Sequence, residues 1–83
     1  MKRIKTRAKT SKGIARAYIK EYGIPSAHEW SAGGSSPKGD FDVIPAHRLG
    51  RGQQGDGCYV LTATSFYNGR PAGVIFGPTF VVG

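Results

Sequence analysis

The dipeptide Asn68-Gly69, set between two long runs of β-branched and aromatic residues, constrains the fold more than any other feature of the chain. A type I′ turn needs a positive φ at both central residues, and it matches the twist of two antiparallel strands. Asn and Gly adopt that conformation at little cost, and the flanking Tyr, Val, Thr, Phe and Ile side chains suit a pleated surface. The sequence therefore predicts a β-hairpin whose arms span about residues 58–67 and 70–82.

The two arms of this hairpin differ in regularity. Gly73, Gly77 and Pro78 interrupt the second arm, so we expect it to bend, to bulge or to divide into two strands. Alternation along the first arm separates an apolar side from a Thr-rich side, and we expect the apolar side to face a helix. That side consists of Tyr59, Leu61, Ala63, Ser65 and Tyr67.

The end of the second arm carries no charge. An apolar strand at an exposed sheet edge promotes aggregation. We therefore expect it to be paired centrally, to be covered by the N-terminal segment, or to pair between subunits or with a partner. In the last case the protein forms a homo-oligomer or adds a strand through Thr79, Phe80, Val81 and Val82.

The net charge of +7 is concentrated in the N-terminal quarter. Residues 1–20 hold eight Lys and Arg and no acid, whereas the remaining residues hold four bases and five acids. Such asymmetry indicates a polyanionic partner, either DNA or RNA or an acidic protein surface. The N-terminal bases expected to contact it are Arg3, Lys5, Arg7, Lys9, Lys12, Arg16 and Lys20.

Residues 11–23 show the periodicity of an amphipathic helix. Thr10 or Ser11 is a suitable N-cap, Gly23 suits the position after the last turn, and Pro25 prevents continuation. The Thr10-Ser11 boundary favours a strand or an arm for residues 1–10 over a helical extension. The apolar arc of the predicted helix consists of Ile14, Ala15, Tyr18, Ile19 and Tyr22.

The basic residues of this segment recur at a spacing that is unfavourable within a helix. If the helix included residues 1–10, its bases would share one arc of about 80°. Like charges four positions apart cost about 0.2–0.5 kcal/mol per pair, so an anionic partner is expected to compensate, the alternative being a solvated face. That arc would consist of Lys5, Lys9, Lys12, Arg16 and Lys20.

Residues 24–57 are rich in loops, with a short strand near residues 41–45 that Pro45 ends or places at an edge. The segment Gly50–Gly57 matches the G-x-G-x-x-G pattern, but a strand follows it instead of a helix, which excludes a dinucleotide site. The glycine amides of this segment form at most an anion-binding nest with Arg48 and Arg51 beside it, and the alternative is a loop without a ligand.

The remaining chemistry-bearing residues predict no catalytic residue, metal or cofactor. His28 and His47 lack the spacing of metal ligands, and Trp30 is expected in the core. Cys58 is the only cysteine, which excludes an internal disulfide and indicates a reducing, cytoplasmic environment. The absence of a long apolar run predicts neither a membrane span nor a membrane partner.

Together these features predict the α+β class. We expect a single small domain of 83 residues, with one amphipathic helix packed on a three- to four-stranded antiparallel sheet and a basic N-terminal strand or arm. A core of this size supplies about 3–5 kcal/mol, so a partner is expected to add stability.

Three functions are compatible with this composition. The first is a non-enzymatic nucleic-acid-binding module that contacts the phosphate backbone. The second is a small inhibitor or adaptor, of the kind found in phages and plasmids, that binds an acidic or nucleoprotein partner. The third is a small basic ribonuclease of toxin type, whose candidate residues are His47, Arg48, Tyr67 and Arg70.

Overall fold

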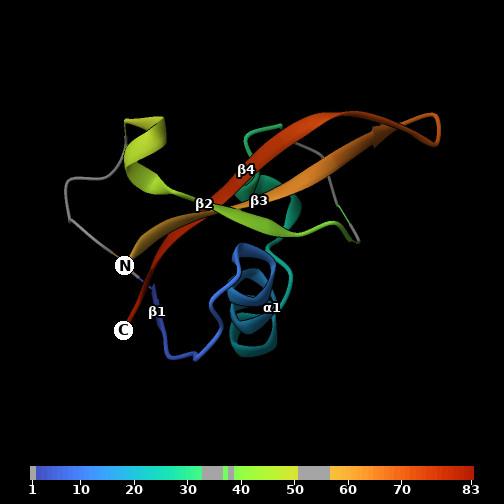
Figure 1. Cartoon of the computed structure of the whole chain (residues 1–83). Coiled ribbons are helices and arrows are strands. Elements are labelled where there is room, and N and C mark those ends of the chain that lie inside the picture. The colour runs from blue at the N-terminus through green and yellow to red at the C-terminus, as the bar shows by residue number, and fades with distance from the viewer. Residues whose placement is uncertain (1, 33–36, 38, 51–56) are drawn as a thin grey trace.

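The computed structural model describes residues 2–32, 37, 39–50 and 57–83. It contains four strands, β1 (Lys2–Ile4), β2 (Asp42–Pro45), β3 (Cys58–Tyr67) and β4 (Arg70–Val82), and the helix α1 (Ser11–Tyr22). The strands form one sheet in the order β1-β4-β3-β2, and α1 lies against one face of it (Figure 1). The predicted α+β class is confirmed.

The sheet is mixed, because its first strand runs parallel to its last. β1 pairs in parallel with β4, from Lys2 opposite Phe80 to Ile4 opposite Val82. The other two pairings, β2 with β3 and β3 with β4, are antiparallel. The N-terminal segment thus covers the charge-free end of β4, which is the second of the three arrangements expected for it. Pairing between chains through residues 79–82 would require β1 to leave this position.

The ends of α1 are set by the residues that the sequence singles out. Thr10 is the N-cap, and its Oγ1 accepts a hydrogen bond of 3.0 Å from the Gly13 N–H. Gly23 ends the helix with a φ of 81°, and its N–H donates to the Ile19 carbonyl at 2.7 Å. Residues 5–10 lie outside the helix, so Lys5 and Lys9 do not share its arc.

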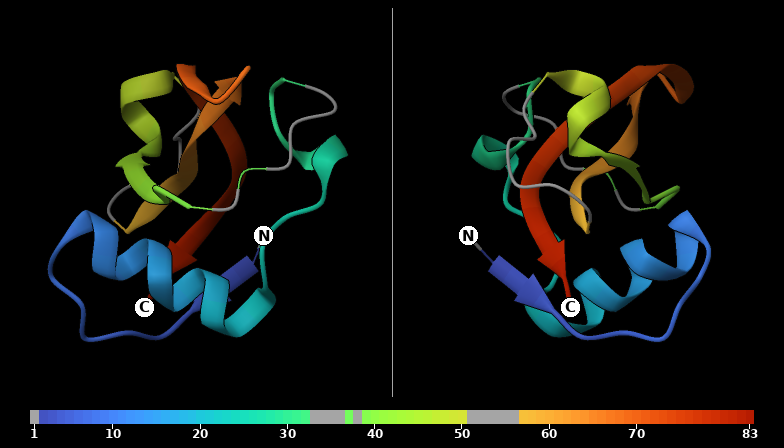
Figure 2. Two further views of the ribbon diagram at one scale, coloured as in Figure 1. Left: turned by 90° about the vertical axis from the view of Figure 1, so that its right-hand side faces the viewer. Right: turned by 60° about the vertical axis from the view of Figure 1, so that its left-hand side comes forward.

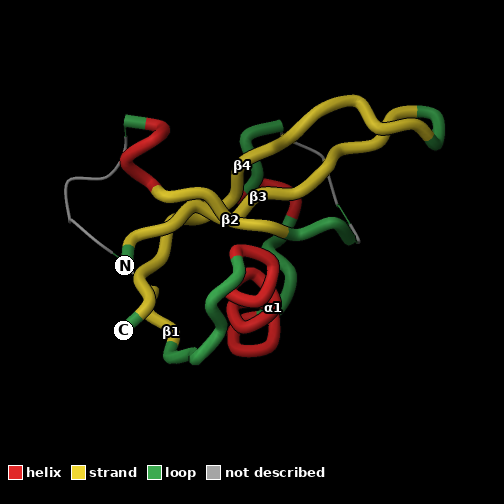
Figure 3. Tube along the Cα trace, in the orientation of Figure 1, coloured by secondary structure: helices red, strands yellow, loops and turns green. Residues whose placement is uncertain are grey.

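The β3–β4 hairpin turns at Asn68 and Gly69, whose φ angles are 52° and 76°. It is longer than either neighbouring pairing, so the segment from Thr64 to Val74 has no other described strand beside it (Figure 3). The register of the β3–β4 pairing shifts at two places, between Val60 and Thr62 and between Ser65 and Phe66. These shifts lie opposite residues 76–79 and 71–73 of β4, which confirms the irregularity expected of the second arm.

Apolar side chains cover both faces of the sheet. The main core lies between the sheet and α1 and includes the fully buried Tyr18, Leu61 and Phe80. Trp30 also belongs to it, as expected, and its Nε1 donates to the Pro25 carbonyl at 3.2 Å. A smaller cluster on the opposite face lies under a 3₁₀ helix at Ala46–Leu49, labelled η2. It contains Ala46, Cys58 and Val60.

Candidate polyanion-binding surface

The segment that connects β1 to α1 runs back alongside the helix (Figure 2). Gly13 permits this close approach, because a Cβ built at position 13 would lie only 2.9 Å from the Cβ of Ala8. Ala8 is half-buried and packs against the main core. Thr6 is half-buried as well, and its Oγ1 accepts a hydrogen bond of 3.0 Å from the Ala8 N–H.

Burial alternates along this segment, so its bases point to solvent. Lys5, Arg7 and Lys9 are exposed, whereas the two residues between them face the protein. This alternation is the period-two pattern of extended chain. The connecting segment therefore presents three cations outward, beside the helix that follows it.

The helix presents three further cations on its outer side. Lys12, Arg16 and Lys20 are exposed and four positions apart, so successive bases are separated by about 6 Å along the axis. The buried residues of the helix, Ile14, Ala15 and Tyr18, occupy a different arc that faces the sheet. We call the six exposed bases of segment and helix the basic surface: Lys5, Arg7, Lys9, Lys12, Arg16 and Lys20.

Two shallow hollows lie at the basic surface. Lys5 and Lys20 line one of about 380 Å³, together with Glu21, so bases from segment and helix meet there. Lys12 and Arg16 line a second of about 190 Å³ with Asp40. Each hollow thus contains one carboxylate beside two cations of the basic surface.

The basic surface makes no neutralising contact within the part of the chain that the structure describes. Among the described residues, none of the six side chains makes an ion pair or a hydrogen bond. An exposed cation without a partner keeps its charge for an external anion. A polyanion that binds this surface therefore breaks no contact that the described residues make.

Lys2 has a structural role instead. Its Nζ lies 3.4 Å from the Tyr18 hydroxyl and 5.0 Å from the centre of the Tyr22 ring. The hydrogen bond to Tyr18 raises the pKa of Lys2, and burial raises the pKa of Tyr18. The Tyr22 hydroxyl donates to the Arg3 carbonyl at 2.7 Å, so two tyrosines of α1 hold β1 in place. The Arg3 side chain is exposed beside Gly83.

The predicted glycine-rich anion site is only partly described. Arg48 is exposed on η2, which covers the sheet face opposite α1 (Figure 1), so it lies on the other side of the sheet from the helix of the basic surface. Arg51 and the glycines at positions 52 and 55 lie outside the described residues. The nest expected at the glycines beside Arg48 and Arg51 therefore stays a prediction.

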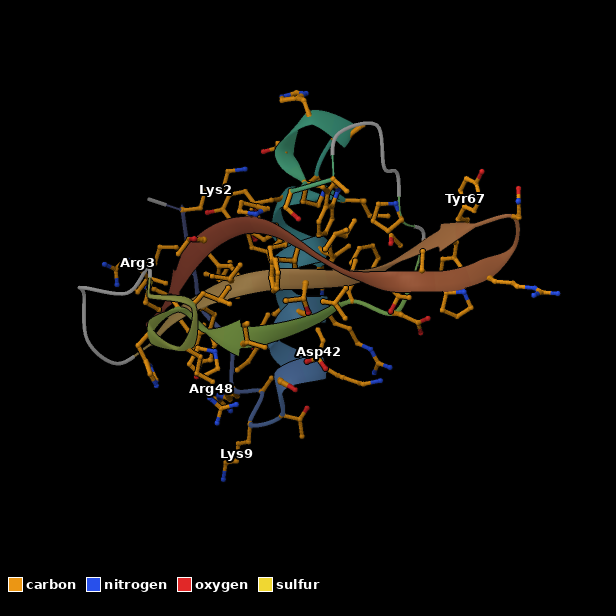
Figure 4. The ribbon with its side chains drawn as sticks, turned by 90° about the horizontal axis from the view of Figure 1, so that it is seen from above. Lys2, Arg3, Lys9, Asp42, Arg48 and Tyr67 are labelled. Atoms are coloured by element: carbon orange, nitrogen blue, oxygen red, sulfur yellow. The ribbon has the colours of Figure 1, made fainter. Side chains whose placement is uncertain are left out.

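The candidate ribonuclease residues are not brought together. His47 and Arg48 follow β2, where Pro45 pairs with Tyr59, whereas Tyr67 lies at the hairpin turn (Figure 4). Eight residues of extended strand separate positions 59 and 67, a distance of about 26 Å. Arg70 pairs with Tyr67 and is equally remote from η2. Within the described residues there is also no cluster of three or more potential metal ligands.

Tyr67 was expected on the side of the first arm that faces the helix, but it is exposed at the end of the hairpin together with Phe66. The exposed fractions of Phe66, Tyr67 and Val74 are 54, 74 and 61%. The sequence does contain a signal for this exposed end. Both arms of the hairpin are much longer than the short strand at residues 42–45, so the hairpin must extend past that neighbour.

Comparison with protein-family models, curated proteins and solved structures found no match. Within the described residues, no helix combines the length and the apolar character needed to cross a lipid bilayer.

Proposed function

We propose that the protein is a nucleic-acid-binding module that contacts the phosphate backbone through the basic surface and acts by binding alone. The observation that carries this proposal is the set of six exposed cations, on a connecting segment and a helix that lie side by side, without a partner among the described residues. Neutralising phosphates with such side chains releases condensed counterions and supplies affinity that is independent of base sequence.

The residue types favour backbone contact over base reading. Four of the six bases are Lys, a point charge that binds phosphate without the planar geometry with which Arg recognises guanine. A bound backbone also explains the repeated like charges on α1. The pairs Lys12–Arg16 and Arg16–Lys20 each cost about 0.2–0.5 kcal/mol in the free protein, and a phosphate between them removes that repulsion.

The test is a salt titration of binding to a generic DNA duplex and to a generic RNA. With six phosphate contacts on a duplex, the slope of log K against log salt is about −5, and the affinity falls about 10³-fold between about 50 and 200 mM salt. Absence of binding to both polymers at low salt would refute the proposal.

Two triple variants locate the site. One changes Lys5, Arg7 and Lys9 to Gln, and the other changes Lys12, Arg16 and Lys20 to Gln. Each is expected to make the duplex slope shallower by about 3, because three contacts are lost. The matched control is Arg48→Gln, which removes one exposed base from the other face of the sheet and leaves the slope unchanged. Triple variants with the wild-type slope would place the contact elsewhere.

A second candidate is binding of an acidic protein through the same surface. It is favoured by a groove of about 450 Å³ next to Lys12, whose lining includes Ile44, Val74 and Phe76. Apolar lining of this kind contributes to protein contacts but not to phosphate contacts. Recovery of one stoichiometric protein without nucleic acid, on an affinity column of the intact chain, would favour this candidate.

A further inference from the structure

The hairpin carries a second feature suited to a nucleic acid, away from the basic surface. Tyr67 is the most exposed large apolar residue of the described chain, and Arg70 is its cross-strand partner. Residues directly opposite each other on an antiparallel pair have Cβ atoms about 5 Å apart, on the same face. An exposed aromatic residue is therefore paired across the hairpin with an exposed cationic residue.

The electrostatic surroundings of this pair favour an anionic ligand. Residues 57–83 contain no Asp or Glu, and Arg70 is their only charged side chain. No described hydrogen bond or ion pair engages the Arg70 side chain. A phosphate that approaches the turn therefore meets one available cation and no carboxylate of the hairpin.

The hairpin is also held in a defined shape. The Ser65 hydroxyl donates to the Gly73 carbonyl at 3.2 Å, across the two arms. Nearer the core, Ser31 accepts from the Phe76 N–H through its Oγ at 3.0 Å and donates its own N–H to the Phe76 carbonyl at 2.8 Å. A ring on a preorganised support loses little conformational freedom when a ligand stacks on it.

The Tyr67 face is too small for an ordinary protein interface. Strand alternation places Phe66 and Pro71 on the opposite face of the ribbon, so one ring and one cation are what this face offers. Stable protein interfaces bury about 800 Å² per partner. A single ring matches one base, because every base has a π face and stacking tolerates any sequence.

We infer that Tyr67 stacks an unpaired base of a bound nucleic acid while Arg70 contacts the adjoining phosphate. The inference rests on the proposed function and adds a preference for single-stranded over duplex nucleic acid. Asp40 and Asp42 line the groove beside Lys12, between the basic surface and the hairpin end, so the two contact regions are separate.

The test compares affinities for a labelled single strand of about twelve thymidines and for a duplex of equal length, by fluorescence anisotropy at low salt. Tyr67→Ala is expected to weaken single-strand binding about 5- to 150-fold, the effect of losing one base–aromatic stack. Duplex binding is expected to stay unchanged. Tyr67→Phe is the matched control, since it keeps the ring and is expected to keep the affinity.

A spectroscopic measurement checks the stack directly. Tyr67→Trp places an indole at the hairpin end, and we expect its emission to be quenched when the thymidine strand binds. The wild type supplies the reference, because its only tryptophan, Trp30, is buried. A Tyr67→Trp variant that binds the strand with wild-type affinity, yet shows no quenching of the new indole, would overturn the inference.

The outcomes separate the two proposals. If Tyr67→Ala binds the single strand like the wild type while the triple basic variants bind weakly, the stacking inference fails and the proposed function stands. If Tyr67→Ala weakens single-strand and duplex binding equally, the assignment to unpaired bases is wrong. If the variant leaves binding intact but converts a dimer to a monomer, the hairpin end is a contact between copies. If the wild type binds no polynucleotide, both proposals fail.

Discussion

Replacement of Gly77 by Ala tests how the base of the β3–β4 hairpin is held. A Cβ at position 77 would lie 2.9, 3.1 and 3.3 Å from three ring atoms of Trp30. Real Cβ atoms essentially never approach another heavy atom more closely than 3.0 Å. Either the ring or the strand must therefore move.

Trp30 has little freedom to give way. Its side chain is 3% exposed, its Nε1 is bonded to the Pro25 carbonyl, and its ring is stacked with Phe41 at a centroid distance of 6.2 Å. Overpacking of a filled core costs about 1–3 kcal/mol. For a domain of this size, a loss of about 2 kcal/mol lowers the melting temperature by roughly 8–16 °C.

Thermal unfolding followed by circular dichroism measures this effect, and the emission of Trp30 reports whether its ring has left the core. The matched control is Gly39→Ala, because a Cβ at position 39 meets no atom within 4 Å and the backbone is outside the left-handed region. Its melting temperature is expected to equal that of the wild type. A Gly77→Ala variant with wild-type melting and emission would refute the close packing of Trp30 on β4.

Three further predictions concern stability. Ile4→Ala is expected to lower the free energy of unfolding by about 2–5 kcal/mol, because Ile4 is only 3% exposed, and to increase light scattering because it uncovers β4. Urea unfolding measures the loss of stability, and an unchanged midpoint would contradict the prediction. The pKa values of Lys2 and Tyr18 are raised, which means that the folded protein favours the protonated form of both groups. The stability that this preference contributes is present at neutral pH and is lost as the pH rises above about 10. The urea midpoint should fall as the pH is raised through the alkaline range. The midpoint of Tyr18→Phe should fall less steeply with pH. Hydrogen bonds from the Ser26 backbone and hydroxyl lower the pKa of Glu29, so its contribution is present above pH 4.5 and is lost as pH falls through the lowered value. Glu29→Gln should flatten this acid limb, and parallel acid limbs would exclude the carboxylate as its cause.

Local signals account for the elements that the sequence predicts well. Asn68-Gly69 defines a hairpin because the positive φ of both residues is an intrinsic preference. Thr10 and Gly23 define the ends of α1 for the same reason, since a cap needs only neighbouring atoms. Alternation along β3 also predicts which side faces the helix, with Leu61 and Ala63 in the main core.

The remaining features depend on contacts between distant parts of the chain. The parallel direction of β1 follows from the burial of Ile4 against a core built by later residues, and three residues of sequence carry no signal for it. The position of Lys5 and Lys9 beside α1, instead of on it, follows from the close contact of Ala8 with Gly13. The residues of the basic surface were predictable from charge, whereas their arrangement was not.

The pairing of the first strand with the last has a consequence for how the protein is made. β1 is synthesised before the other three described strands, but its partner Phe80–Val82 belongs to the last of them. At about 5–20 residues per second, the nascent N-terminal segment spends several seconds without its partner. During that time the apolar Ile4 lacks the core residues of β4 that help to bury it in the folded protein. Completion of the sheet is therefore expected to be a late event, coupled to the synthesis of β4.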